Sequence, residues 1–117
     1  MEHTPALRTD FYQLTMAVGY LRRQMAQQTV VCEAFVRRLP KHRGFLLLCG
    51  LERIVEYIRA LRFTRAQVDY LKRHPSLAGA LDSETEEALL DFAFEGDVWA
   101  MPEGTVAFAN EPLVRVQ

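Results

Sequence analysis

The sequence predicts an α+β fold, with helices first and a small antiparallel sheet after them. Two observations support this prediction. Over residues 11–25 and 51–61, apolar residues recur at three- and four-residue steps, which is typical of amphipathic helices. From Asp97 onward they alternate with a period of two, and turn-forming residues separate the apolar runs, which is typical of short strands.

Composition limits the classes of function. The chain has 117 residues, half of them hydrophobic, which suits one domain. With 14 Lys and Arg against 15 Asp and Glu, the net charge of −1 gives no reason to expect binding to nucleic acid or to a membrane. Cys32 and Cys49 form no metal or redox spacing, and their apolar neighbours predict buried thiols. We find no signal peptide or spanning segment and expect a cytoplasmic protein.

The first helix is predicted from Phe11 to about Gln24. Asp10 is expected to cap its first turn with its carboxylate, and Gln13 to reach back and complete a capping box. The stripe expected to face the core consists of Phe11, Leu14, Val18, Leu21 and Met25.

Tyr12 lies outside that stripe, on a neighbouring face with Met16 and Tyr20, at the electropositive start of the helix. A phenol ring in this position could stack on a flat anionic ligand while free backbone amides meet its charge. The alternative is a half-buried packing residue with a solvated hydroxyl, and position alone favours that alternative.

A strand is predicted over residues 29–38, where β-forming residues surround Glu33. We expect Glu33 to pair with Arg37 or Arg38 on a neighbouring strand or subunit. With these two arginines, the loop over residues 39–44 forms the densest cationic patch in the chain. The patch is either an anion site for phosphate or pyrophosphate, or a solvated loop.

Residues 45–49 are apolar throughout and fit either a buried strand or the start of a helix. A second helix with a regular apolar stripe is predicted over residues 51–61. A third should start at Thr64, where Gln67 completes a capping box, and end near His74, because proline follows.

A fourth helix is predicted to start near residue 82 or 83. Residues 82–91 hold five acids and no basic residue, which we interpret as a solvated helix face, since a metal site needs convergent ligands. Three strands should follow and form a meander, at about residues 98–100, 106–108 and 113–116.

Five segments resemble the nicotinate phosphoribosyltransferase family, and they occur in the family's order over nearly the whole chain. The first, similar to the family's N-terminal signature, is Thr9-Asp10-Phe11-Tyr12-Gln13-Leu14-Thr15-Met16. The others are Glu33-Ala34-Phe35-Val36-Arg37-Arg38-Leu39-Pro40, Gly50-Leu51-Glu52, Phe94-Glu95-Gly96-Asp97-Val98-Trp99-Ala100 and Pro102-Glu103-Gly104-Thr105-Val106. Any one motif is weak, but five in register are specific.

The resemblance implies an α/β-hammerhead fold, as in the N-terminal domain of type II phosphoribosyltransferases. Relatives continue into a β/α barrel that carries the phosphoribosyl diphosphate site and a phosphorylated histidine, and this chain has no such segment. We therefore expect a flexible tail over residues 1–8 and, over residues 9–117, a phosphoribosyltransferase N-terminal domain truncated at its C-terminus. This piece alone should be inactive.

The resemblance also implies a reaction, in which nicotinate and phosphoribosyl diphosphate give nicotinate mononucleotide for NAD biosynthesis. ATP and Mg²⁺ would drive it in this ligase-type transferase, bound mainly outside this chain, and a homodimer would share the active site. Tyr12 is expected to stack on or hydrogen-bond nicotinate, Asp10 to fix the helix start that presents it, and Arg37 to bind an anionic group or brace an interface. No catalytic residue or metal ligand is expected in this chain.

Three alternatives remain open. Nicotinamide phosphoribosyltransferase is a close relative, whereas quinolinate phosphoribosyltransferase lacks the tyrosine motif. A non-catalytic dimerisation or interaction module would expose apolar surface on the predicted sheet. A lipoyl-type carrier would need a lysine at a hairpin tip, and the tips here hold Glu103 and Asn110.

Overall fold

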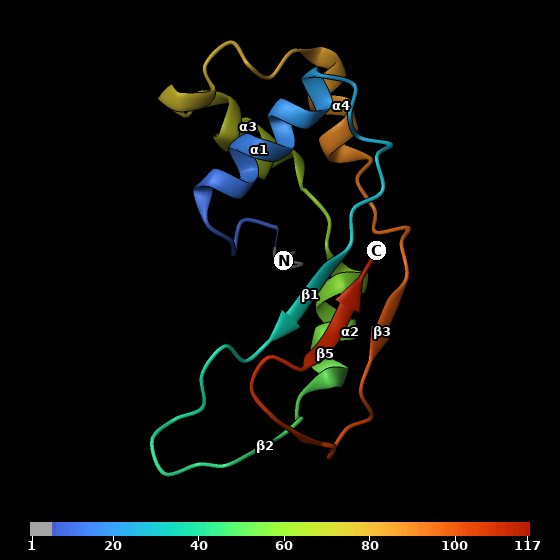
Figure 1. The fold of residues 1–117 in the computed structure, drawn as a ribbon. Helices are drawn as coiled ribbons and strands as arrows, with labels where there is room; N and C mark the ends of the chain where they lie inside the picture. The colour runs from blue at the N-terminus through green and yellow to red at the C-terminus, as the bar shows by residue number, and fades with distance from the viewer. Residues whose placement is uncertain (1–5) are drawn as a thin grey trace. The chain divides into compact units, whose positions relative to one another are not determined.

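A computed structural model describes residues 6–117, which form four α-helices, a short 3₁₀ helix and five strands (Figure 1). The predicted α+β class is confirmed. The described residues divide into two compact units. Unit 1 contains residues 6–28 and 57–94, and unit 2 contains residues 29–56 and 95–117.

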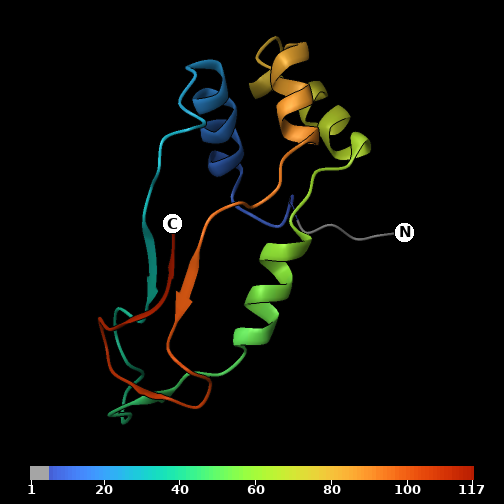
Figure 2. The same cartoon turned by 90° about the vertical axis from the view of Figure 1, so that its right-hand side faces the viewer.

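Unit 1 is helical (Figure 2), and its helices pack around one apolar cluster. Its elements are α1 (Phe11–Arg22), α3 (Arg65–Arg73), η1 (Pro75–Leu77) and α4 (Ser83–Leu90). The buried cluster consists of Leu14, Val18, Val68, Leu71, Leu77, Leu81 and Leu89. Val68 and Leu71 of α3 lie deepest, with 0% and 1% of their surface exposed. The core of unit 1 is therefore centred on α3.

The start of α1 differs from its prediction. Asp10 occupies the N-cap, but its side chain makes no capping hydrogen bond within the described residues. The Gln13 side chain accepts instead from the Thr9 hydroxyl. The predicted capping box is wrong, because Gln13 bonds to Thr9 rather than to the Asp10 backbone. The middle of the predicted stripe, Leu14 and Val18, is buried as expected.

The capping box of α3 was predicted correctly, whereas for α4 only the start near residue 82 or 83 was predicted. The Thr64 hydroxyl accepts from the Gln67 N–H at 3.3 Å, and Gln67 Oε1 accepts from the Thr64 N–H at 2.9 Å. His74 ends α3. Asp82 caps α4 by accepting from the Thr85 N–H at 2.9 Å, and hydrogen bonding to Thr85 lowers the pKa of the Asp82 carboxyl.

The acidic segment of α4 is only partly solvated. Glu86 pairs with Lys72 and, at 3.4 Å, with Arg65, so that α4 is linked to α3. Within residues 6–117, no group of three or more His, Cys, Asp or Glu side chains could hold a metal ion.

Unit 2 carries the strands and the first part of a helix. Its elements are β1 (Cys32–Phe35), β2 (Leu46–Leu47), α2 (Leu51–Ala60, which runs on into unit 1), β3 (Val98–Ala100), β4 (Val106–Ala107) and β5 (Pro112–Val116). In Figure 1, β5 lies between β1 and β3 and pairs antiparallel with both. The strands β2 and β4 pair with each other.

The three C-terminal strands were predicted correctly, but their arrangement as a meander is wrong. Residue alternation identifies a strand without naming its partner. The Leu48 N–H donates to the Thr105 carbonyl at 2.9 Å, and the Gly104 N–H donates to the Leu48 carbonyl at 2.8 Å. These bonds hold the β3–β4 connection against β2, which leaves β5 free to pair between β1 and β3.

Glu33 and the cysteines also differ from their predictions. The register sets Glu33 opposite Arg115, whose Nε and Nη2 donate to Glu33 Oε1 at 2.9 and 2.7 Å. The expected pairing with Arg37 or Arg38 is therefore wrong. Cys32, in β1, and Cys49, between β2 and α2, are both exposed rather than buried, because apolar sequence neighbours do not decide what covers a residue in the fold.

The predicted tail, residues 1–8, lies partly outside the described residues. Within it, Ala6 is 4% exposed, and Leu7 packs against the core cluster of unit 1.

A distant carboxylate caps α2. Glu103 lies in the loop between β3 and β4, and its two oxygens accept from the Gly50 N–H at 2.6 Å and from the Leu51 N–H at 3.0 Å. Free amides at a helix start favour a carboxylate. Glu103 therefore fastens the start of α2 to the strand region of unit 2.

Replacing Glu103 with alanine should destabilise the first turn of α2 by about 1–2 kcal/mol, because two amides lose their acceptor. Hydrogen exchange at the Gly50 and Leu51 amides would measure this as faster exchange in the variant. Glu95→Ala removes an exposed carboxylate of the same unit and should change these rates little. Unchanged protection in Glu103→Ala would contradict the capping role.

Candidate functional site

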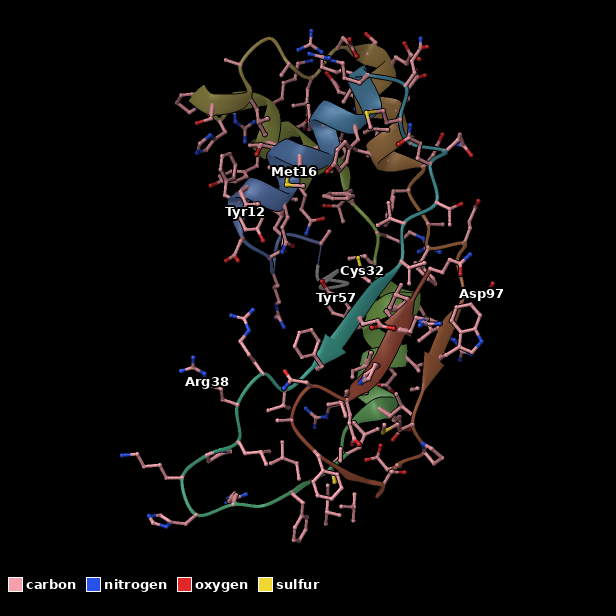
Figure 3. All side chains as sticks on the ribbon, viewed as in Figure 1. Tyr12, Met16, Cys32, Arg38, Tyr57 and Asp97 are labelled. Atoms are coloured by element: carbon pink, nitrogen blue, oxygen red, sulfur yellow. The ribbon has the colours of Figure 1, made fainter. Side chains whose placement is uncertain are left out.

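One side of α1 carries large side chains that are exposed. Tyr12, Met16 and Tyr20 follow each other at steps of four residues, and all three are exposed. Figure 3 shows Tyr12 and Met16 one turn apart on the same side of the helix. Tyr12 is 58% exposed although its side chain is large and aromatic. We call these three residues the α1 face, and its polar end lies in the first turn.

Asp10 and Tyr12 come together at the start of α1. Asp10 is exposed at the N-cap, and its carboxylate takes no part in capping within the described residues. The backbone at Tyr12 is held from the other side, because the Thr15 hydroxyl donates to the Tyr12 carbonyl at 2.8 Å. The helix start that carries Tyr12 is therefore fixed by backbone and hydroxyl contacts rather than by the Asp10 carboxylate.

Three side chains form a hydrogen-bonded chain that ends on the phenol of Tyr12. The Thr9 hydroxyl donates to Gln13 Oε1, and Gln13 Nε2 donates to Tyr12 Oη at 3.4 Å. The sequence analysis missed this relationship because it assigned Gln13 to a capping box. The four-residue separation of Thr9 and Gln13 was the available signal, although Thr9 precedes the helix.

An apolar groove of about 360 Å³ borders this chain within unit 1. Thr9 and Gln13 contribute polar atoms to its wall, together with the hydroxyl-bearing Tyr20 and Tyr57. The remaining lining is apolar, and no charged side chain contributes. A carboxylate inside this groove would find no countercharge in the lining.

The first residue of α1 rests on an imidazole. The rings of Phe11 and His74 lie 4.3 Å apart between centroids, with an interplanar angle of 44°. His74 Nδ1 accepts from the Ser76 N–H at 3.3 Å, which orients the imidazole. Phe11 thereby links the start of α1 to the end of α3.

Arg37 belongs to unit 2, at the edge of the predicted cationic patch. Arg37 and Arg38 are both exposed, and Figure 3 shows Arg38 extending from the loop. His42, in the same loop, has a positive φ of 66°. No basic residue of the loop forms an ion pair with a residue in the range 6–117, so these charges are available to an anion.

Among residues 6–117, no helix combines the length and the apolar character that crossing a membrane requires.

Comparison with known proteins identifies relatives over nearly the whole chain. The family model for the nicotinate phosphoribosyltransferase (NAPRTase) N-terminal domain matches residues 7–117. Nicotinate phosphoribosyltransferase pncB2 of Mycobacterium tuberculosis is 41% identical over 115 residues, which cover 98% of this chain and 24% of that protein. The human nicotinate phosphoribosyltransferase is 37% identical over 115 residues, covering 94% of this chain and 20% of that protein.

Among solved structures, the crystal structure of human nicotinic acid phosphoribosyltransferase superposes with a TM-score of 0.80 and 38% identity. The match covers 92% of this chain and 21% of the human chain. The chain therefore spans only about a fifth to a quarter of the length of the relatives it matches.

Proposed function

Because the chain belongs to the nicotinate phosphoribosyltransferase family, as the match over residues 7–117 shows, we propose that it is the N-terminal part of an enzyme that joins nicotinate to phosphoribosyl diphosphate. The products are nicotinate mononucleotide and pyrophosphate, in the biosynthesis of NAD. The observation that carries this proposal is the family match itself, supported by the exposed aromatic side chain of Tyr12 within the matched signature.

In this proposal, the described residues position a substrate and the rest of the enzyme completes the site. The transition state has oxocarbenium character at the ribose while diphosphate leaves, so catalysis depends on placing the pyridine nitrogen and on stabilising the leaving charge. Tyr12 contacts nicotinate, by stacking on the ring or through its phenol. Asp10 lies at the N-cap of the helix that presents Tyr12. Arg37 binds an anionic group or stabilises an interface.

ATP hydrolysis drives the proposed reaction, as in a ligase-type transferase, with Mg²⁺ as the metal. The described residues hold no group of three or more side chains suited to a metal ion, so the proposal places the Mg²⁺ and ATP contacts mainly in other parts of the enzyme. For this chain, the contribution that remains is recognition of nicotinate and of an anionic group.

We also propose a cytoplasmic homodimer in which the N-terminal part of one subunit completes the active site of the other. Such a shared site requires aromatic and cationic side chains that are accessible to the other subunit. The exposure of Tyr12 in unit 1 and of Arg37 in unit 2 fits this requirement.

The direct test is an assay of the intact natural protein with nicotinate and phosphoribosyl diphosphate, with and without ATP. The proposal expects nicotinate mononucleotide to form, faster with ATP, and expects nicotinamide and quinolinate to be poor substrates. Preference for nicotinamide or quinolinate would contradict the assigned substrate, and absence of any mononucleotide product would contradict the enzymatic function.

A non-catalytic dimerisation or interaction module is the second candidate, because Phe35 and Trp99 on the strands of unit 2 are large, apolar and about half exposed. The mass of the natural protein distinguishes the two candidates. A product several times larger than 13.5 kDa supports the enzyme, and a product of 13.5 kDa supports the module.

Replacing Arg37 with alanine should raise the KM of the intact enzyme for phosphoribosyl diphosphate by about tenfold, because a charge-assisted hydrogen bond to an anionic group is lost. Steady-state kinetics measures this, and the KM for nicotinate should change little. Arg38→Ala removes the same charge one residue away and is the matched control. If both variants raised the KM for phosphoribosyl diphosphate equally, the total charge of the loop rather than the position of Arg37 would determine binding.

A further inference from the structure

We infer that Glu111 is a positioning residue for Arg37, because it closes the turn that fixes the backbone immediately before Arg37. This inference rests on the proposed function, in which Arg37 binds an anionic group. It goes further by naming a residue of another segment that determines where the guanidinium of Arg37 lies.

The last hydrogen bond of the chain before Arg37 is made by the backbone of Val36. The Val36 carbonyl accepts from the Asn110 N–H at 2.8 Å. Within residues 6–117, residues 37–45 form no hydrogen bond or ion pair with another segment. The direction in which the backbone continues from β1 to Arg37 is therefore set at Val36.

Glu111 closes the turn that carries Asn110. This turn joins β4 to β5 and consists of residues 108–111. Glu111 Oε2 accepts from the Phe108 N–H at 2.8 Å, so that the side chain bridges the two ends of the turn. Asn110 takes the third position with a φ of 64°, a left-handed conformation that glycine and asparagine tolerate best. The Glu111 carboxylate therefore stabilises the conformation in which the Asn110 N–H meets Val36.

The pairing of β1 with β5 is irregular at the same place. Ala34 pairs with Val114 and Phe35 pairs with Pro112, so that the register shifts between these two residues of β1. Such a shift bends a strand and changes the direction of the side chains next to it. In Figure 1, the turn before β5 lies beside the end of β1. The bend and the turn together fix the backbone that carries Arg37.

Preorganisation explains how a residue that does not touch the anion affects its binding. An arginine binds phosphate groups through hydrogen bonds of fixed geometry, so that their strength depends on where the guanidinium lies. If the backbone before Arg37 were less fixed, part of the binding free energy would be lost in ordering it. Glu111 reduces this loss because it holds the turn against Val36.

Titration of the intact natural protein with inorganic pyrophosphate tests this role. Glu111→Ala removes the acceptor of the Phe108 N–H and should raise the dissociation constant for pyrophosphate by about three- to tenfold. Glu111→Gln keeps an acceptor oxygen at the same reach and should stay within about twofold of the unmodified protein. Both variants remove one negative charge, so an effect of charge alone would strengthen pyrophosphate binding in both.

Asn110 provides a second pair of variants that leaves the carboxylate in place. Asn110→Ala makes the left-handed conformation less favourable and should weaken pyrophosphate binding by about threefold. Asn110→Gly also removes the side chain but adopts that conformation readily, so it should stay within about twofold. Calorimetry with nicotinate and the melting temperature show whether each variant folds, and the dissociation constant for nicotinate should change by less than about twofold in all four variants.

A double-mutant cycle separates this inference from the function on which it rests. If Glu111 acts through Arg37, adding Glu111→Ala to Arg37→Ala should weaken pyrophosphate binding by less than about a further twofold. Full additivity of the two substitutions, or unchanged pyrophosphate binding in Glu111→Ala and Asn110→Ala, would refute the positioning role and leave Arg37 as an anion contact. If Arg37→Ala itself leaves pyrophosphate binding unchanged, the proposed role of Arg37 fails, and this inference fails with it.

Discussion

Replacing Tyr12 with alanine should weaken nicotinate binding to the intact natural protein by about 30- to 2,000-fold. The estimate combines an aromatic stacking contribution of about 0.5–1.5 kcal/mol with a charge-assisted hydrogen bond of about 1.5–3 kcal/mol. Because Tyr12 is 58% exposed, little of the effect should come from lost packing inside unit 1. Isothermal titration calorimetry with nicotinate measures the loss.

Two variants show which part of the side chain matters. Tyr12→Phe keeps the ring and removes the hydroxyl, so it should retain stacking and lose about 10- to 150-fold in affinity. Tyr70→Ala removes an exposed tyrosine of α3 in the same unit and should leave the affinity unchanged. Equal binding by Tyr12→Ala and the unmodified protein would refute a role for the α1 face in the nicotinate site.

Replacing Leu71 with alanine should destabilise the helical core of unit 1 by about 2–5 kcal/mol. Leu71 is 1% exposed within the cluster that α1, α3 and α4 share, so truncation leaves a cavity that the surrounding helices cannot fill. The α3 amides of the variant should exchange hydrogen faster than those of the unmodified protein, because the free energy of local unfolding falls by this amount.

Leu47→Ala is the matched control for this truncation. Leu47 is 56% exposed in β2, so the same atoms are removed without opening a cavity, and the expected change is within about 0.5 kcal/mol. Equal effects of the two leucine truncations would mean that α3 does not form the centre of unit 1.

Interactions over three or four residues were the most predictable part of this fold. The capping box between Thr64 and Gln67 depends on residues close in sequence and is present, and α4 begins at Ser83, within the predicted start at residue 82 or 83. Asp10 and Gln13 show the limit of such reasoning. Their spacing also suits a capping box, but Thr9 competes for the Gln13 side chain and holds it.

Partners that are distant in sequence could not be predicted from local patterns. Glu33 pairs with Arg115 because β5 lies between β1 and β3, and that register depends on strands 82 residues apart. Glu103 caps α2 across 53 residues, although the sequence suggested only a turn. The exposed cysteines have the same cause, since burial of a residue depends on which parts of the fold cover it.

For the candidate site, the sequence predicted where Tyr12 and Asp10 lie on α1 better than it predicted the contacts of their side chains. Tyr12 stood out because it leaves the apolar stripe of α1, and the structure places it on the surface. Asp10 lies at the predicted N-cap without the predicted capping bond. The relay from Thr9 and Gln13 to the phenol requires side-chain directions, which spacing alone does not specify.

A crystal structure of the intact natural protein with nicotinate tests the central claim most directly. The account predicts the pyridine ring against Tyr12, with the ring centroids about 4.5–7 Å apart or the phenol oxygen about 2.5–3.0 Å from the nicotinate carboxylate. Nicotinate bound at a site without any contact from the α1 face of either subunit would contradict it.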